Sequence, residues 1–396
     1  MAREEAADIR RVESRVASYI NEFVALRQDI HQHPELSFKE HRTSDIVATQ
    51  LASWGYEVTR GIAGTGVVGS LRRGSGSKTL GIRADMDALP IQEATGLPYA
   101  SVNAGVMHAC GHDGHTAILL AAARTLAEVG QFDGQLQLIF QPAEETGSGA
   151  RKMIAEGLFE RFPCDAVFGL HNWPGVPAGH LGCVAGPAMA SIDQAVITIR
   201  GKGGHGAEPH KTVDPVVVSA HLITALQTIV SRNVDPLDMG VVTVGSIHGG
   251  AASNVIPDAV ELKLTMRSFR PEIRQLLQER VPALAKAQAE SFGAEAEVDY
   301  QLGFPAVLNH VDETAFARTV AEDTFGAGQV EAGFRPRTAS EDFAYMLQAR
   351  KGSYVFLGNG EGASLHSPRY DFNDAVLGLA ATYWTRLAER FLAPAA

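Results

Sequence analysis

The hydrophobic and polar positions near the N-terminus predict helices. Apolar residues recur every three or four positions from Ile9 to Ile30, as expected for one long amphipathic helix. We expect this helix to end at His31-Gln-His33-Pro34, because the residue before a proline disfavours helical conformation. For these two histidines, a capping or packing role is a simpler interpretation than metal ligation. A second helix is expected over 42–54, with Gly55 at its C-terminal cap.

Three short apolar runs each end at side chains that can bind a metal. Residues 79–84 lead into Asp85-Met86-Asp87, residues 135–140 lead into Gln141-Pro-Ala-Glu144-Glu145, and residues 165–170 lead into His171. Helices expected over 115–129 and 149–156 alternate with these runs, which is typical of an α/β domain with a largely parallel sheet. Ligands bind beyond the carboxyl ends of such strands, so these side chains are expected to lie at one edge.

Between residues 192 and 303 the pattern changes to β-α-β-β-α-β, the ferredoxin-like order. The expected strands are 194–200, 240–247, 260–269 and 295–301, and the expected helices are 214–231 and 271–292. The first of these helices is expected to begin at Asp214-Pro215, with Asp214 as N-cap and Pro215 at the first helical position. The α/β pattern then returns with helices near 313–325 and 340–347, a strand over 353–357 and a last helix over 373–391. We therefore predict an α/β fold with a split catalytic domain, residues 1–191 and 304–396, and an inserted domain, residues 192–303.

Residues 107–115, MHACGHDGH, hold one thiol, three imidazoles and one carboxylate in nine positions. Thiolate and neutral imidazole are ligands for borderline metals such as zinc. The apolar run from Thr116 predicts a buried helix, so this loop should lie at a helix N-terminus. A structural zinc knuckle and scattered core histidines are the alternatives. The acidic groups expected at the strand ends favour a catalytic metal site.

The net charge narrows the possible binding partners, and the cysteine content narrows the possible cellular compartment. The formal net charge is −11 and the isoelectric point is about 5.7, which argues against nucleic acid or an anionic membrane as partner. Three cysteines, Cys110, Cys164 and Cys183, make no disulfide framework and fit a reducing compartment. The first residues lack the apolar core of a signal peptide, and no apolar run is long enough to span a membrane. We therefore expect a cytoplasmic protein.

Five motifs occur in order and together resemble the M20 metallopeptidase clan. They are Asp85-Met-Asp87, His108-Ala-Cys110-Gly-His112-Asp113, Gln141-Pro-Ala-Glu144-Glu145, His171 and Leu365-His366-Ser-Pro. The chain is most similar to the branch that contains aminoacylases, hippurate hydrolases and auxin-conjugate amidohydrolases. Asp85 stands where many members of the wider clan have a metal-ligating histidine.

The resemblance implies a ligand set for two divalent ions, namely Cys110, His112, Glu145, His171 and His366. Five ligands are too many for one tetrahedral site with an open position, which agrees with two ions. Zinc suits the thiolate, and manganese, cobalt or nickel could also occupy such a site.

Two further side chains, Glu144 and Asp87, are expected to support the metals or the chemistry. Two adjacent carboxylates cannot easily both bind one ion, so Glu144 is expected to be the general base beside the ligand Glu145. A solvated surface position is the alternative for Glu144. Asp87 is expected to orient a ligand histidine. Cys110 acting as a nucleophile, with a neighbouring histidine as its base, is the competing chemistry.

The inserted domain carries candidate substrate contacts. In the clan, the histidine that corresponds to His205 reaches a catalytic centre, and Asn254 and Arg267 are similar candidates. The implied function is metal-dependent hydrolysis of N-acyl amino acids by a homodimer whose inserted domain acts as lid and dimerisation domain. A dipeptidase or carboxypeptidase, and a non-catalytic metal-dependent binding protein, are the alternatives.

Overall fold

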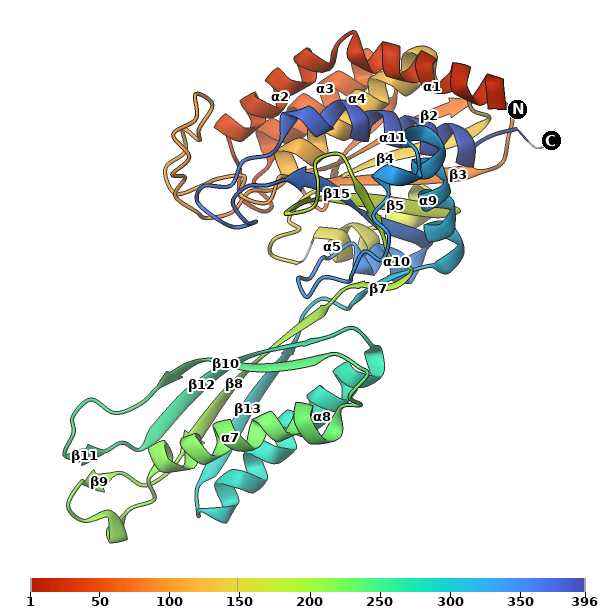
Figure 1. Cartoon of the computed structure of the whole chain (residues 1–396). Helices are drawn as coiled ribbons and strands as arrows, with labels where there is room; N and C mark the ends of the chain where they lie inside the picture. The colour runs from red at the N-terminus through yellow and green to blue at the C-terminus, as the bar shows by residue number, and fades with distance from the viewer. Residues whose placement is uncertain (1, 148, 395–396) are drawn as a thin grey trace. The chain divides into compact units, whose positions relative to one another are not determined.

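The computed structural model describes residues 2–147 and 149–394 (Figure 1). These residues form two compact units. The unit predicted to be catalytic, called the catalytic unit below, comprises the chain up to Gly186, Leu308–Arg335 and the chain from Asp342 onward. The inserted unit comprises Pro187–Val307 and the short return Pro336–Glu341. The sequence pattern, which predicted cuts near 192 and 303, gave no sign of this return.

The catalytic unit contains a seven-stranded sheet within the described residues, in the order β1-β2-β4-β3-β5-β15-β6. Its central strands β4, β3, β5 and β15 are parallel, whereas β1, β2 and β6 pair antiparallel at the edges. The strands are β1 (Glu57–Ile62), β2 (Gly66–Arg73), β3 (Thr79–Asp85), β4 (Gly134–Gln141), β5 (Ala166–Pro174), β6 (Leu181–Cys183) and β15 (Lys351–Gly360). Near-continuous burial of β3, β4 and β5 is what parallel strands covered on both faces require. The predicted α/β fold is therefore confirmed.

Helices cover both faces of this sheet. Helix α4 packs with α11 on one face and α5 packs with α10 on the other, as Figure 1 shows. Nearly every residue of α4 is buried, because its apolar side chains surround the helix. The helices are α1 (Ala2–Ala17), α2 (Ile20–Gln32), α3 (His41–Ser53), α4 (His112–Val129), α5 (Gly149–Ala155), α6 (Leu158–Arg161), α9 (Val311–Phe325), α10 (Ala344–Ala349) and α11 (Leu377–Phe391), with 3-10 turns at Ala327–Gln329 and Asp374–Val376.

Two differences between the predicted and the observed elements have a clear cause in tertiary contacts. The single N-terminal helix is two helices, because the chain breaks at Tyr19, whose ring is buried and whose hydroxyl hydrogen-bonds Thr125 of α4. The strand expected to end before His171 continues to Pro174, since β15 pairs with it as far as that residue. His171 therefore lies inside β5.

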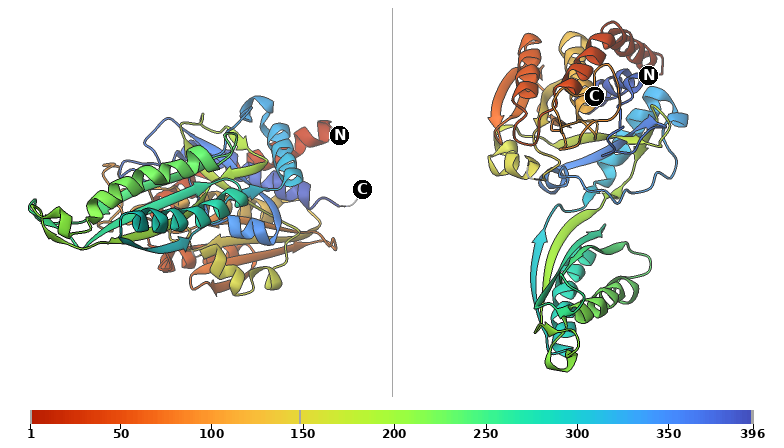
Figure 2. Two further views of the ribbon diagram at one scale, coloured as in Figure 1. Left: turned by 90° about the horizontal axis from the view of Figure 1, so that it is seen from below. Right: turned by 90° about the vertical axis from the view of Figure 1, so that its left-hand side faces the viewer.

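The inserted unit has the predicted ferredoxin-like order. Its antiparallel sheet runs β10-β12-β8-β13, and α7 and α8 cover one face (Figure 2). Its elements are β8 (Ser191–Arg200), α7 (Pro215–Asn233), β10 (Gly240–His248), β12 (Ala259–Ser268), α8 (Pro271–Ser291) and β13 (Glu295–Leu302). A small ladder of β9 (Gly204–His205) and β11 (Val255–Ile256), the 3-10 turn Pro209–Lys211, and strands β7 (Gly186–Met189) and β14 (Val307–Asn309) were not predicted. Among the described residues, no helix is both long and apolar enough to cross a membrane.

The start of α7 shows how sequence sets a helix boundary. Asp214 is the N-cap, and its carboxylate accepts a hydrogen bond from the backbone N–H of Val216 at 2.9 Å. Pro215 occupies the first helical position, where no N–H is needed. Both features were predicted from the Asp-Pro pair.

We expect Asp214→Ala to lower the free energy of unfolding by about 1 kcal/mol, because the first turn of α7 loses its capping acceptor. Urea unfolding measures the change, and Asp214→Asn, which keeps a capping oxygen, is the matched control. Equal loss of stability in both variants would contradict the capping role.

Candidate metal centre

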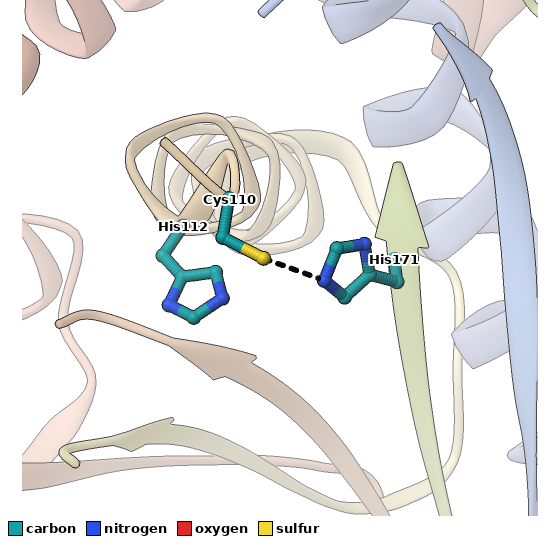
Figure 3. Close-up of side chains that lie close together, drawn as sticks. All are labelled: Cys110, His112 and His171. Atoms are coloured by element: carbon teal, nitrogen blue, oxygen red, sulfur yellow. Dashed lines mark hydrogen bonds between the residues drawn. The ribbon is translucent and has the colours of Figure 1, made fainter. Parts of the chain in front are cut away.

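Three candidate ligands meet at the start of α4. Gly111 precedes the helix with a φ of 90°, a left-handed conformation that glycine adopts without strain and that brings Cys110 and His112 to the same side. His171 reaches them from β5, and its Nε2 lies 3.4 Å from the Cys110 sulfur (Figure 3). All three side chains are buried. The loop, the helix and the strand were predicted to meet here.

The hydrogen bonds of the two histidines leave one ring nitrogen of each for a ligand. His171 donates from Nδ1 to the backbone carbonyl of Asn172 at 2.7 Å, so its Nε2 carries the lone pair. His112 Nδ1 lies 3.3 Å from the carboxylate of Asp87, and its Nε2 points away from that partner. Such bonds fix the tautomer and ring orientation that metal ligation needs.

Glu145 and His366 complete the cluster from two other loops. Glu145 follows β4, and one of its oxygens lies 3.5 Å from His366 Nε2 and 3.9 Å from His112 Nε2. His366 has a left-handed φ of 63°, and its backbone N–H donates to the carbonyl of Ala109 at 2.8 Å, which ties its loop to the Cys-His loop. Ligand atoms of Cys110, Glu145 and His366 all lie within 4.8 Å of one another. All five expected ligands are thus brought together.

Two atoms at the centre lack a hydrogen-bond partner. Among the described residues, His112 Nε2 and Glu145 Oε1 are buried without one. Buried polar atoms without partners are costly, and a bound cation satisfies a lone pair and a carboxylate oxygen together. The donor set of sulfur, nitrogen and oxygen matches the preferences of zinc and similar divalent metals. The residues therefore fit a divalent metal centre.

The electrostatics of the centre also favour a cation. Burial opposes the charged form of His112, yet the carboxylates of Asp85, Asp87 and Glu145 outweigh burial and raise its pKa to about 10. Burial and the neighbouring His115 instead hold the pKa of His171 well below its usual value. One side of the centre thus carries excess negative charge, while His171 stays neutral as a ligand requires.

Asp87 organises the centre more extensively than the sequence suggested. It accepts the backbone N–H groups of Glu144 and Glu145, each at 3.0 Å, and the hydroxyl of Ser37 at 2.6 Å, besides facing His112. Burial would raise the pKa of Asp87, but these hydrogen bonds outweigh burial and lower it. One carboxylate therefore orients a candidate ligand and the turn that bears Glu144.

Sequence reasoning missed Arg83, Asn172 and Tyr370, which form buried hydrogen bonds behind the candidate ligands. Asp85 pairs with Arg83 and with His115, each at 2.6 Å, so both its oxygens already have partners. His115 in turn contacts Asn172 at 2.7 Å, and the Asn172 amide bonds the hydroxyl of Tyr370. Arg83 inside the apolar run 79–84 was the available signal, since a buried arginine needs carboxylate partners.

His31 lies outside the candidate ligand set, in a buried ion cluster. Its Nδ1 lies 2.9 Å from Asp113 and its Nε2 lies 3.4 Å from Glu93. Burial opposes its charged form, but Asp113 outweighs burial and raises the pKa of His31 to about 9. Arg27 adds a bidentate pair with Asp374, each bond at 2.8 Å. The cluster links α2, the first turn of α4 and the segment before α11, so His31 has a packing role.

The candidate substrate residues of the inserted unit do not lie together. His205 pairs with Val255 in the small β9–β11 ladder, and the neighbouring Asn254 accepts a backbone hydrogen bond from Gly206 at 2.8 Å. His205 and Asn254 are both exposed. Arg267 lies at the opposite end of β12, about 30 Å away at 3.3 Å per residue, and donates to Ser340 at 2.6 Å. Within the inserted unit, His205 and Asn254 therefore lie at one end of the sheet and Arg267 lies at the other.

Comparison with known proteins shows the family of the chain. Residues 81–390 match the profile of peptidase family M20/M25/M40. The chain is 45% identical to a hippurate hydrolase of Campylobacter jejuni, over 94% of this chain and 97% of that protein. It is 40% identical to an N-acetyl-L-cysteine deacetylase of Bacillus subtilis, over 94% of this chain and 88% of that protein. A solved Bacillus subtilis structure, described as a dinuclear metal binding peptidase from the M20 family, has a TM-score of 0.83 and 33% identity over 95% of this chain and 99% of that one. The chain belongs to peptidase family M20/M25/M40.

Proposed function

We propose that the protein hydrolyses the amide bond of N-acyl amino acids and releases a carboxylic acid and a free amino acid. The observation that carries the proposal is the set of converging ligand atoms, two of them buried without partners, beside the buried carboxylate of Glu144. The names of the hippurate hydrolase and deacetylase relatives point to the same substrate class.

The proposed metal ligands are Cys110, His112, Glu145, His171 and His366. Two divalent ions held by them would acidify a water molecule and polarise the scissile carbonyl. The mixed sulfur, nitrogen and oxygen set favours zinc, with manganese, cobalt or nickel as possible occupants. His112 and Glu145 are central to the site, since their unpaired atoms lie 3.9 Å apart.

Glu144 is the proposed general base. Its carboxylate lies within 4.8 Å of ligand atoms of His112 and Glu145, and one oxygen accepts the backbone N–H of Asp342 at 3.3 Å. In this position Glu144 would take the proton of the attacking water and return it to the leaving nitrogen. Asp87 would fix the backbone of Glu144 and Glu145 by accepting their N–H groups.

The inserted unit is proposed as lid and dimerisation domain. Strand β10 is an edge strand of its sheet, which offers unpaired backbone groups to a second copy, so we propose a homodimer. His205, Asn254 and Arg267 are proposed substrate contacts, with Arg267 acting from the other end of the sheet. In the part of the chain that the structure describes, none of Cys110, Cys164 and Cys183 forms a disulfide, which supports a reducing compartment, the cytoplasm.

Replacing Glu144 or Glu145 by glutamine should distinguish the general base from the metal ligand. We expect Glu144→Gln to lower kcat by roughly 10²–10⁴-fold and to keep the metal content, because only the proton acceptor is lost. Glu145→Gln should instead lose metal. Steady-state kinetics and elemental analysis on the same preparations measure both effects, and the reverse pattern would contradict the two assignments.

Cysteine substitution tests the thiolate as a ligand. Cys110→Ser should weaken metal retention against a chelator, since a hard hydroxyl replaces a soft thiolate. Cys164→Ser replaces a buried cysteine that is outside the candidate ligand set. This variant is the matched control and should keep its metal. A Cys110→Ser protein with unchanged metal retention and no activity would favour the nucleophile chemistry instead.

Substrate charge tests recognition of the amino-acid moiety. Replacing the free carboxylate of an N-acyl amino acid by its primary amide should cost about 1.5–3 kcal/mol, or roughly 10- to 150-fold in kcat/KM, because a charge-assisted hydrogen bond is lost. Dipeptides of the same C-terminal residue, assayed in parallel, distinguish the dipeptidase or carboxypeptidase alternative. Equal kcat/KM for acid and amide, or a His205→Ala variant with unchanged kinetics, would argue against the proposed substrate contacts.

A further inference from the structure

The turn that bears Glu144 and Glu145 is held by carboxylates at three consecutive backbone N–H groups. Asp87 accepts the N–H of Glu144 and of Glu145, each at 3.0 Å. The preceding N–H, that of Ala143, donates to the carboxylate of Glu40 at 2.9 Å. Glu40 comes from a segment about a hundred residues earlier, and no role in metal binding or proton transfer accounts for it.

The conformation of Ala143 explains why this turn needs support. Its φ is 53°, in the left-handed region that residues with a Cβ seldom adopt. Such a conformation persists where the surrounding structure imposes it. Because Ala143 directly precedes Glu144, its φ sets the directions in which the two adjacent carboxylates point. Relaxation of Ala143 would therefore move the proposed base and the proposed ligand together.

The Glu40 carboxylate is a buried acceptor of three hydrogen bonds. It is completely buried, and one carboxylate oxygen accepts the N–H of Phe38 and that of Ala143, each at 2.9 Å. The other oxygen accepts the hydroxyl of Thr65 at 2.5 Å. Burial, with a contribution from Asp87, raises the pKa of Glu40. Placing an acidic side chain here is thus costly, and its hydrogen bonds offset that cost.

The same segment also reaches Asp87. Ser37 donates its hydroxyl to Asp87 at 2.6 Å, so residues 37–40 contact the turn directly through Glu40 and indirectly through Asp87. Glu35, at the start of the segment, serves a different purpose. Its carboxylate accepts the N–H groups of Arg42 and Thr43 at the start of α3, each at 2.9 Å. Glu35 therefore offers an internal comparison for Glu40.

We propose that Glu40 is a positioning residue that, by accepting the Ala143 N–H, holds the Ala143–Glu145 turn in the conformation needed for Glu144 to act on substrate and for Glu145 to bind metal. The inference rests on the proposed function for the role of Glu144. Its effect on metal retention through Glu145 is independent of any substrate.

The test compares Glu40→Leu with Glu40→Gln in the full-length, metal-loaded protein. Leucine removes the acceptor, so kcat should fall about 100-fold, as expected for misplaced catalytic groups, while KM changes less than about threefold. Metal retention against a chelator should weaken in parallel. Glutamine can present its amide oxygen to the same two N–H groups, so Glu40→Gln should restore kcat to within about tenfold of the parent.

Glu35→Leu is the matched control, because it also removes an acceptor of two backbone N–H groups in the same segment. It should lower Tm but leave kcat and metal retention unchanged. If Glu40→Leu lowers Tm and keeps the kcat and metal retention of Glu35→Leu, the positioning role is overturned. Should Glu40→Leu fail to fold, Glu40→Asp and Glu35→Asp replace the pair, with the same expected contrast and the same refuting result.

Chelator competition distinguishes a failure of the Glu40 positioning role from a failure of the proposed hydrolytic function. A parent protein that hydrolyses no N-acyl amino acid would refute the proposed function. Metal retention in the Glu40 and Glu35 variants would still decide whether Glu40 positions the turn, since that measurement needs no substrate.

Discussion

The catalytic unit depends on a small group of buried ligand atoms that the protein does not satisfy by itself. Within the described residues, His112 Nε2 and Glu145 Oε1 have no hydrogen-bond partner, although both are excluded from solvent. An arrangement of this kind costs several kcal/mol in an apolar interior unless a cation occupies it. The surplus of carboxylates that raises the pKa of His112 adds to the same demand. The surrounding fold can be understood as the means of keeping these atoms in place.

Two features of the fold hold these ligand atoms in place, namely the parallel strands and the buried carboxylates beyond their ends. Parallel strands bring the ends of β3, β4 and β5 to one edge, which supplies Asp87, Glu145 and His171 from segments far apart in the sequence. Buried carboxylates then fix the irregular backbone beyond the strand ends. Asp87 and Glu40 accept three successive N–H groups around the turn that follows β4. Buried carboxylates therefore hold the backbone of the turn after β4, which carries the candidate ligand Glu145 and which would otherwise be supported only as a loop.

Sequence patterns predicted what periodicity and residue chemistry determine. Apolar runs ending in Asp, Glu or His predicted the strands and their shared edge, and the Asp-Pro pair predicted the start of α7. Sequence patterns failed where tertiary contacts determine the end of a helix or strand. The break at Tyr19 arises from its burial against α4, and the extension of β5 past His171 arises from pairing with β15. Glu40 was not singled out from the sequence, because Thr65 and Ala143, two of its three donors, come from segments that only folding brings together.

The central claim is that the five converging side chains hold two divalent ions. Crystals of the protein grown with zinc, with diffraction recorded on both sides of the zinc absorption edge, test it most directly. The account predicts two anomalous peaks per chain, surrounded by Cys110, His112, Glu145, His171 and His366 at the 2.0–2.3 Å distances usual for zinc. A fully loaded protein with its zinc bound elsewhere, or with a single ion that leaves Glu145 and His366 uncoordinated, would contradict it.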